Sequence, residues 1–419
     1  MKAPQLRPYQ LNACAAVRDH WRAGTRRVLL VAPTGAGKTL LGADLIGQAR
    51  SLWVAPRQEI VTQTAKRLRG TRERVGVMLS GHREDADAAV QVATIQSLLG
   101  RQNMPAADVV VLDEAHHYLA ARWRELADCY PRSLIVGLTA TPQRADGEPM
   151  GDAFDELVVA AHYSQLVADG FLVPATVLRP SESLGGDLAQ DPIEAWFRHS
   201  GGVGSFFFAP RVNIAQEWTA RLISLGVPAA TIHANTPGAE RLDCMARFRA
   251  GKLRALCNVN TLTEGVDVPE AGCAVLGRSF GFVGDFLQAV GRILRPSKGK
   301  ERAIVLDLVG ATHRHGLPTD DRSYALRGRP ISGEGFEREQ GERASFAQEI
   351  KGLELQTVGA MPAFAPPAVI AEPRDESKLR AEYDRLTVAA RDCGRGPALA
   401  AIKFRELFGH EPPSEWRNG

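Results

Sequence analysis

Short apolar runs alternate with longer amphipathic segments along most of the chain. In the first part, the runs begin near residues 28, 51, 90, 109 and 133. Each has the length of one strand, and most lack the apolar–polar alternation of a half-exposed strand, which is typical of parallel strands buried on both faces. The pattern predicts an α/β fold with two doubly wound parallel sheets in tandem. The second series of runs lies at 205–210, 229–233, 254–259, 273–276 and 303–308.

The division between the two sheets is indicated by a stretch where the periodicity fades. Between about 160 and 204, Pro174, Pro180 and two glycine pairs interrupt the pattern. After the second series, the sequence becomes polar and rich in Gly and Pro, and then ends in two short amphipathic segments. We expect a first lobe at 1–175, a connection at 176–204, a second lobe at 205–330, a flexible tether at 331–375 and a small helical segment at 376–419.

The amino-acid composition excludes only a few classes of function. The chain has 419 residues and a formal net charge of +3, so nucleic-acid binding has to be argued from local sites and not from bulk charge. The six cysteines are scattered without a C-x-x-C pair, which predicts neither a zinc site nor a disulfide framework. Free thiols fit a reducing cytoplasm. The sequence contains no run of 18 consecutive apolar residues, so it does not predict a membrane span.

The segment 32–39, Ala-Pro-Thr-Gly-Ala-Gly-Lys-Thr, lies between a predicted strand and a predicted helix. This is the setting of a phosphate-binding loop, although its first residue is Ala and not Gly. Gly35 and Gly37 allow the backbone N–H groups to converge on phosphates. Lys38 would reach the β- and γ-phosphates of ATP, and the Thr39 hydroxyl would bind Mg²⁺. The predicted nucleotide contacts in this loop are Thr34, Gly35, Ala36, Gly37, Lys38 and Thr39.

A second group of polar residues follows the apolar strand at 109–112. Asp113 would bind Mg²⁺, and Glu114 would position and deprotonate the attacking water. A helix cap is the plain alternative, but the phosphate loop upstream favours the catalytic interpretation. Thr139 and Thr141 end the next strand, where their hydroxyls could hydrogen-bond the loop that contains Asp113 and His116.

Contacts with the base and with nucleic acid rest on weaker signals. Arg7 and Gln10 lie just upstream of the phosphate loop, and the Gln10 amide can both donate to and accept from an adenine edge. Arg57, at the end of the second strand, is a candidate phosphate contact. Hydroxyl and amide groups at the next helix start suit a phosphate backbone, but plain capping explains them equally well. These residues are Thr94, Gln96 and Ser97.

A helix expected at 283–295 has two distinct faces. Leu287, Val290 and Leu294 form an apolar stripe. A different face carries the polar residues Gln288, Arg292 and Arg295. Such arginines often only solvate a helix. In a lobe without its own phosphate loop, they could instead act as arginine fingers on ATP bound by the other lobe.

As a set, these motifs resemble those of superfamily 2 helicases of the DEAD/DEAH class, in particular short phage and bacterial DNA helicases related to type III restriction motor subunits. The order and spacing of the motifs carry the resemblance over about residues 5–310. The matching segments are 6–10 with the adenine-reading segment, 32–39 with motif I, 113–116 (Asp-Glu-Ala-His) with the motif that names the class, 139–141 with motif III, 264–267 with motif V and 288–295 with motif VI.

The resemblance implies two RecA-like lobes, ATP and Mg²⁺ in the cleft between them, and a nucleic-acid strand across both. It adds Gly265 and Asp267 as nucleotide contacts and Thr261 as a nucleic-acid contact. It also implies that His116, Thr139 and Thr141 couple the cleft to the strand. Relatives often carry a cysteine cluster near 330–370, which this chain lacks, so no zinc module is expected.

The sequence therefore predicts an ATP-dependent DNA helicase or translocase. An RNA helicase stays open, because nothing in the motifs separates ribose from deoxyribose. A translocase that remodels branched DNA and an ATP-gated clamp that does not move also stay open. Glu114 and Arg292 argue against a clamp, because a clamp does not need fast hydrolysis.

Overall fold

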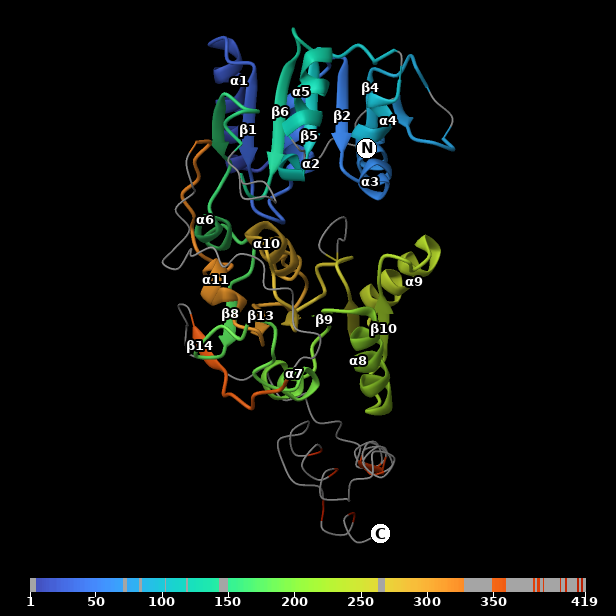
Figure 1. The fold of residues 1–419 in the computed structure, drawn as a ribbon, viewed down its shortest axis with the longest axis vertical. Helices are drawn as coiled ribbons and strands as arrows, with labels where there is room; N and C mark the ends of the chain where they lie inside the picture. Colours follow the sequence, from blue (N-terminus) through green and yellow to red (C-terminus); the bar gives the residue numbers. More distant parts are fainter. Residues whose placement is uncertain are drawn as a thin grey trace. The chain divides into compact units, whose positions relative to one another are not determined.

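The computed structural model describes residues 5–70, 74–82, 85–101, 103–117, 120–142, 150–262, 268–327 and 349–358, and isolated positions after 379. The chain forms two compact units, each with one seven-stranded sheet (Figure 1). The first unit comprises 1–172, 281–291 and 318–334, and the second comprises 173–280, 292–317 and 335–419. No helix in the described part of the chain is long and apolar enough to cross a membrane.

The sheet of the first unit has the strand order β3-β4-β2-β5-β6-β1-β7, and all its neighbours are parallel. Its strands are β1 (Arg27–Val31), β2 (Ser51–Ala55), β3 (Val75–Met78), β4 (Val90–Thr94), β5 (Val109–Asp113), β6 (Leu134–Thr139) and β7 (Glu156–Val159). Its helices are α1 (Pro8–Arg22), α2 (Lys38–Ile46), α3 (Gln58–Arg69), α4 (Ile95–Leu99), the 3₁₀ turn η1 (Ala115–His117), α5 (Ala120–Cys129), α6 (Tyr163–Ala168) and α10 (Val283–Gly291).

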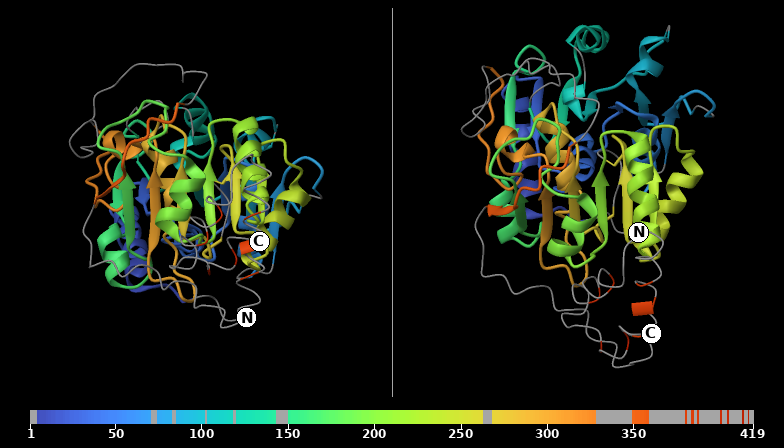
Figure 2. Two further views of the ribbon diagram at one scale, coloured as in Figure 1. Left: turned by 90° about the horizontal axis from the view of Figure 1, so that it is seen from below. Right: turned by 60° about the horizontal axis from the view of Figure 1, so that its bottom comes forward.

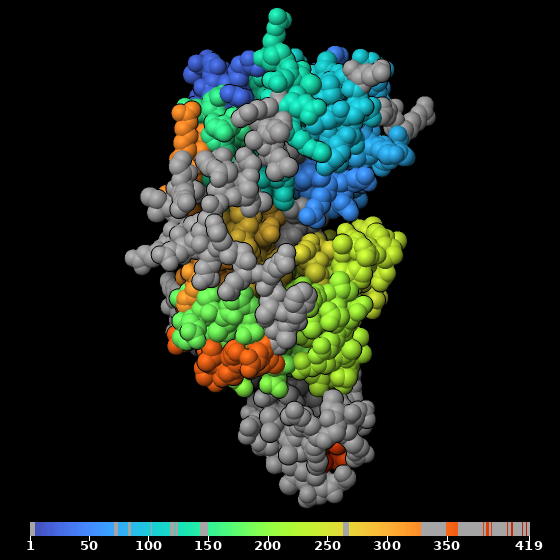
Figure 3. All heavy atoms as spheres, in the orientation of Figure 1, coloured from blue at the N-terminus to red at the C-terminus, as the bar shows by residue number. Residues whose placement is uncertain are grey.

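Helices cover the first sheet because its central strands are apolar on both faces. Val28 to Val31 of β1 are fully buried, as are Leu52 and Val54 of β2. Helix α2 contacts β5 and β6, while α3 contacts β2, β3 and β4. The polar side of α3 stays at the surface of this unit, where its blue side chains are in view (Figure 3).

The second sheet repeats the strand order of the first: its strands, numbered from β8, run third, fourth, second, fifth, sixth, first and seventh. The seventh strand differs, because β14 is antiparallel to its neighbour β8. The strands are β8 (Ala175–Arg179), β9 (Ser205–Phe208), β10 (Ala229–Ile232), β11 (Ala255–Asn258), β12 (Cys273–Leu276), β13 (Ala303–Asp307) and β14 (Gln356–Val358). The helices are α7 (Pro192–Ser200), α8 (Val212–Ser224), α9 (Gly238–Arg249) and α11 (Ala311–His315).

Aromatic residues of β9 show why helices lie on both faces of the second sheet (Figure 2). Successive side chains of a strand point to opposite faces. Phe207 contacts Trp196 of α7 and Trp218 of α8. Its neighbour Phe206, on the other face, contacts Phe248 of α9. Both faces are therefore apolar, as the unbroken run at 205–208 predicts.

The predicted fold class is confirmed, but the expected boundaries differ from the units observed. The segment 176–204, expected to be a connection, contributes most of β8 and all of α7 to the second unit. Pro174 and Pro180 flank β8 and do not interrupt it, which explains the error. Part of the expected tether forms β14. Most of the segment 376–419 lies outside the described residues.

The helix expected at 283–295 is also shorter than predicted. Helix α10 ends at Gly291, and Arg292 begins a turn. The proposed common face of Gln288, Arg292 and Arg295 is therefore wrong. Gln288 is only 1% exposed, although the spacing of Leu287, Val290 and Leu294 placed it on a separate polar face. The apolar stripe therefore did not identify the buried face of the helix correctly.

Candidate functional site

The loop between β1 and α2 has the backbone of a phosphate-binding loop. Gly35 and Gly37 have φ angles of 97° and 81°, a region that favours glycine. Lys38 begins α2, so it lies at the positive end of that helix. The buried hydroxyl of Thr34 has no hydrogen-bond partner within the described part of the chain. The loop thus offers a backbone cradle, an ammonium and an unused hydroxyl, which fits a bound polyphosphate.

Helix α1 supports this loop from the side. The Tyr9 hydroxyl donates to the Ala36 carbonyl at 2.7 Å, and the Gln10 amide donates to the same oxygen at 2.9 Å. The Gln10 carbonyl accepts from the Arg7 backbone N–H. Both ends of the Gln10 amide are thus used within the protein, and its contact with adenine stays a prediction. The Arg7 guanidinium lies 4.0 Å from the ring centre of Phe171, an aromatic partner that the sequence did not reveal.

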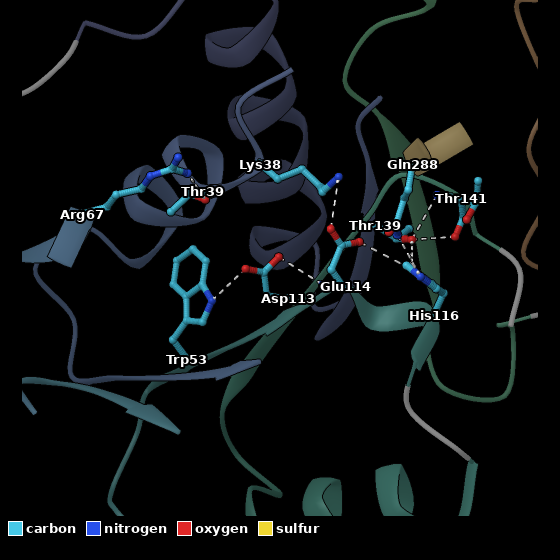
Figure 4. A network of polar contacts seen from close by, with 10 residues as sticks. All are labelled: Lys38, Thr39, Trp53, Arg67, Asp113, Glu114, His116, Thr139, Thr141 and Gln288. Carbon is cyan, nitrogen blue, oxygen red and sulfur yellow. Dashed lines mark hydrogen bonds and ion pairs between the residues drawn. The ribbon is translucent and has the colours of Figure 1, made fainter. Parts of the chain in front are cut away.

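The two acidic residues lie at the end of β5 and face the loop (Figure 4). Lys38 Nζ lies 3.6 Å from Glu114 Oε1. Glu114 has a φ of 49°, unusual for a residue with a side chain, and such strain costs roughly 1–3 kcal/mol. The buried carboxylate of Asp113 accepts from Trp53 Nε1 at 3.3 Å and from the Glu114 N–H at 3.1 Å.

The electrostatics of Asp113 favour a bound cation. Burial, together with the nearby Glu114 carboxylate, raises the pKa of Asp113 to about 7, while Lys38 opposes this shift. A divalent cation beside the carboxylate would reverse the shift, because positive charge favours the ionised form. Asp113 and Thr39 supply the oxygen ligands that Mg²⁺ prefers. The residues present therefore fit Mg²⁺.

Two contacts around these residues were missed by sequence reasoning. Trp53 was interpreted only as part of a strand, although Gly42 marks its position: a Cβ on Gly42 would lie 2.4 Å from the indole. Arg67, an exposed residue of α3, donates from Nη1 to the Thr39 hydroxyl at 3.3 Å. Other charged residues of α3, such as Glu59 and the exposed Lys66, surround it in the sequence. Helix periodicity therefore does not distinguish Arg67 from residues that only face solvent.

A chain of polar contacts leads from Glu114 through His116 (Figure 4). His116 Nδ1 lies 3.7 Å from Glu114 Oε2 and 2.9 Å from the Thr139 hydroxyl. Thr139 donates to the Thr141 carbonyl, so it accepts from a protonated Nδ1 of His116. This assignment leaves Nε2 of the neutral ring as an acceptor.

Helix α10 lies at the far end of this chain, within the same unit. The Gln288 amide nitrogen lies 3.3 Å from His116 Nε2, which completes the link from Glu114 to α10. A Cβ on Gly291 would lie 2.4 Å from Thr34 Cβ, so this glycine permits close packing of α10 on the phosphate loop. The expected hydrogen bond between Thr139 and the loop after β5 is present.

The candidate nucleic-acid contacts of the first unit gather at one sheet edge. Strands β2 and β4 are parallel neighbours, with Ala55 beside Thr94. Arg57 and Gln96, just beyond their carboxyl ends, are exposed. Thr94 is buried, and its hydroxyl accepts from the Ser97 N–H as a helix cap. The capping interpretation thus describes Thr94 in this structure, and its contact with nucleic acid stays a prediction.

The remaining predicted residues belong to the second unit. The Thr261 hydroxyl donates to the Ile232 carbonyl at 3.2 Å. Gly265 and Asp267 lie outside the described residues. Arg292 is 7% exposed, and the backbone carbonyl of Arg295 accepts from Lys300. The geometry tests none of their expected roles.

Comparison with known proteins identifies the family. The model of the type III restriction enzyme res subunit matches residues 3–144, which include the phosphate-binding loop and the acidic pair. The helicase conserved C-terminal domain matches residues 193–297, which include α10 and both arginines. The chain belongs to the superfamily 2 helicases. This membership places it in the class of ATP-hydrolysing helicases.

Relatives of this helicase occur in phages, bacteria, archaea and yeasts. It is 26% identical over 316 residues to the 51.5 kDa protein of Lactococcus phage (isolate 7-9), covering 69% of this chain and 67% of that protein. It is 28% identical over 377 residues to the DNA 3'-5' helicase XPB of Kineococcus radiotolerans, covering 79% of this chain and 63% of that protein. The helicase thus spans about two thirds of the length of each of these relatives.

A solved structure confirms the fold. The ATP-dependent Type ISP restriction-modification enzyme LlaBIII, bound to DNA, aligns with a TM-score of 0.57 and 18% identity. The match covers 73% of this helicase and 28% of that chain. At this identity the likeness shows the shared fold, with two RecA-like lobes, and no more.

Proposed function

We propose that this helicase is an ATP-driven motor that moves along DNA. The chain of contacts from Glu114 through His116 to Gln288 supports this most directly. It connects a carboxylate beside the phosphate loop to α10. The last residue of α10 is Gly291, and the next residue in the chain, Arg292, belongs to the second unit. A change at Glu114 during ATP hydrolysis would alter the contacts of α10, and α10 would pass the change to the second unit.

In this proposal, each polar group has one role in hydrolysis. Lys38 binds the phosphates, and Glu114 accepts the proton of the attacking water. Thr39 and Asp113 would hold Mg²⁺, which neutralises phosphate charge when bound. The arginine segment stabilises charge that develops on the transferred phosphoryl group. Its residues are Arg292 and Arg295, with Gly265 and Asp267 as further nucleotide contacts.

Movement follows if the two units hold the strand alternately. The sheet edge with Arg57 and Gln96 supplies the contacts of the first unit, and Thr261 supplies one in the second. His116, Thr139 and Thr141 couple these contacts to the nucleotide. ATP favours the state in which both units bind it, and loss of the γ-phosphate removes that link.

DNA is the proposed substrate because the bacterial relative is named a DNA helicase and the structural neighbour was solved with DNA. A cytoplasmic location remains a prediction from the free thiols.

ATP hydrolysis measured with single-stranded DNA, duplex DNA, forked DNA and RNA tests the substrate class. We expect DNA to stimulate the rate more than RNA of the same length. Stimulation by RNA alone would favour an RNA helicase, and preference for the fork would favour remodelling of branched DNA.

Arg57 provides a test of the proposed nucleic-acid surface. Arg57→Ala should weaken binding of all DNA sequences alike, because a phosphate contact carries no sequence information. The slope of log affinity against log salt should fall by about 0.7 for single strands. Binding is measured by fluorescence anisotropy over a salt series. Arg132→Ala is the matched control. Exposed Arg132 precedes β6, so it lies at the amino ends of the parallel strands, whereas Arg57 lies at their carboxyl ends. An unchanged slope for Arg57→Ala would exclude a phosphate contact there.

A further inference from the structure

A half-buried lysine of the second unit lies among three backbone carbonyls. Lys300 Nζ donates to the carbonyls of Pro269 at 2.9 Å, Ala271 at 2.6 Å and Arg295 at 2.9 Å. A lysine ammonium has three donors and no acceptor, so these contacts use all of its hydrogen-bonding capacity. Such full use of one side chain by three carbonyls is a specific arrangement and not a surface contact.

The local backbone directs Lys300 into this position. Its N–H donates to the Ser297 carbonyl at 3.0 Å, which closes a turn after the arginine segment. Gly299 has a φ of 77°, a conformation that a residue with a side chain rarely adopts. The turn brings the chain back so that the Lys300 side chain reaches the Arg295 carbonyl five residues earlier.

The position of Lys300 is costly for a charged group. Burial lowers the pKa of its ammonium from 10.5 to about 8, with nearby Arg295 acting in the same direction and Glu270 opposing it. A fully engaged ammonium in a costly position is expected where its hydrogen bonds fix a geometry. A solvated lysine, such as exposed Lys298, has no such constraint.

The three carbonyls lie next to or within segments that matter for the proposed function. Pro269 and Ala271 follow the segment 264–267, which resembles motif V. Arg295 ends the segment that contains both proposed arginine fingers. One side chain therefore joins the backbone just after the motif V segment to the end of the arginine segment.

We propose that Lys300 is a positioning residue, whose ammonium holds the backbone of the arginine segment against residues 269–271 and so fixes Arg292 and Arg295 for ATP hydrolysis. This inference rests on the proposed function. It predicts an effect on turnover and not on nucleotide affinity, because the arginines act on charge that develops in the transition state.

The test compares Lys300→Met with the matched control Lys298→Met. Methionine keeps a long apolar stem but donates no hydrogen bond. We expect kcat for ATP hydrolysis to fall about 10- to 100-fold, since misplacement of a catalytic group by about 1 Å has effects of this size. The affinity for a fluorescent ATP analogue should change less than about threefold, well under the tenfold that corresponds to 1.4 kcal/mol. Lys298→Met should behave like the wild type.

Chemical rescue separates positioning from a general effect on folding. Lys300→Cys treated with bromoethylamine regains an ammonium at nearly the original distance, and its kcat should return towards the wild-type value. Treated wild-type protein controls for modification of exposed Cys129. Failure of rescue in a protein with normal thermal unfolding would overturn the proposal. Parallel loss of kcat, nucleotide affinity and thermal stability in Lys300→Met would also overturn it.

Failure of this inference is distinguishable from failure of the proposed function. A wild-type protein that does not hydrolyse ATP with any nucleic acid would contradict the proposed function itself. A wild-type protein that hydrolyses ATP normally, together with an equally active Lys300→Met variant, would contradict only the role of Lys300.

Discussion

Arg292→Ala is expected to reduce kcat for ATP hydrolysis roughly 10³-fold or more while changing nucleotide affinity far less. Arg292 is bonded to Gly291, whose close packing on Thr34 places the end of α10 beside the phosphate loop. In the proposed function, the Arg292 guanidinium acts on charge that develops in the transition state and not on ground-state ATP. Single-turnover hydrolysis and binding of a fluorescent ATP analogue separate the two effects.

Two further variants sharpen this prediction. Arg292→Lys should not restore the rate, because an ammonium cannot make the forked contact of a guanidinium. Arg314→Ala is the matched control, since exposed Arg314 lies on α11 of the same unit and outside the proposed site. Near-normal hydrolysis by both Arg292 variants would exclude an active site shared by the two units.

Glu114→Gln is expected to reduce turnover on the order of 10²-fold or more, because it removes the proposed general base. The amide keeps the size of the side chain but loses the charge that faces Lys38. ATP binding should persist, since Lys38, Thr39 and Asp113 are intact. Steady-state hydrolysis and nucleotide binding are measured side by side.

The control for this variant is Glu125→Gln, the same change at an exposed position of α5. It should leave both hydrolysis and binding unchanged. Turnover by Glu114→Gln within a few-fold of the wild type would remove Glu114 from the role of base. Loss of ATP binding would instead show that the carboxylate mainly organises the loop through Lys38.

The parts of the fold that the sequence predicted are those governed by strong local patterns. Apolar runs such as 109–112 have to be buried on both faces, and glycines such as Gly35 and Gly37 mark backbone that few other residues adopt. Strand β8 was missed because its flanking prolines resemble those of a linker. Strand β14 was missed because its pairing partner lies far away in the sequence.

The candidate site was predictable to a similar degree. Lys38, Asp113 and Glu114, which the motifs assign to one site, lie together in the structure, with Lys38 Nζ 3.6 Å from Glu114 Oε1. Their roles in hydrolysis stay predictions. Periodicity misjudged Gln288, because its burial follows from a hydrogen bond to His116 and not from apolar character. The contacts of Trp53 and Arg67 depend on tertiary packing, which leaves only indirect traces, such as Gly42, in the sequence.

The central claim is that ATP hydrolysis moves this protein along DNA. Displacement of a labelled third strand from a DNA triplex measures such movement directly and does not require strand separation. We expect wild-type protein to displace the third strand only with hydrolysable ATP, and Glu114→Gln to bind DNA and ATP without displacing it. Vigorous DNA-stimulated hydrolysis with no displacement from any triplex would contradict the motor.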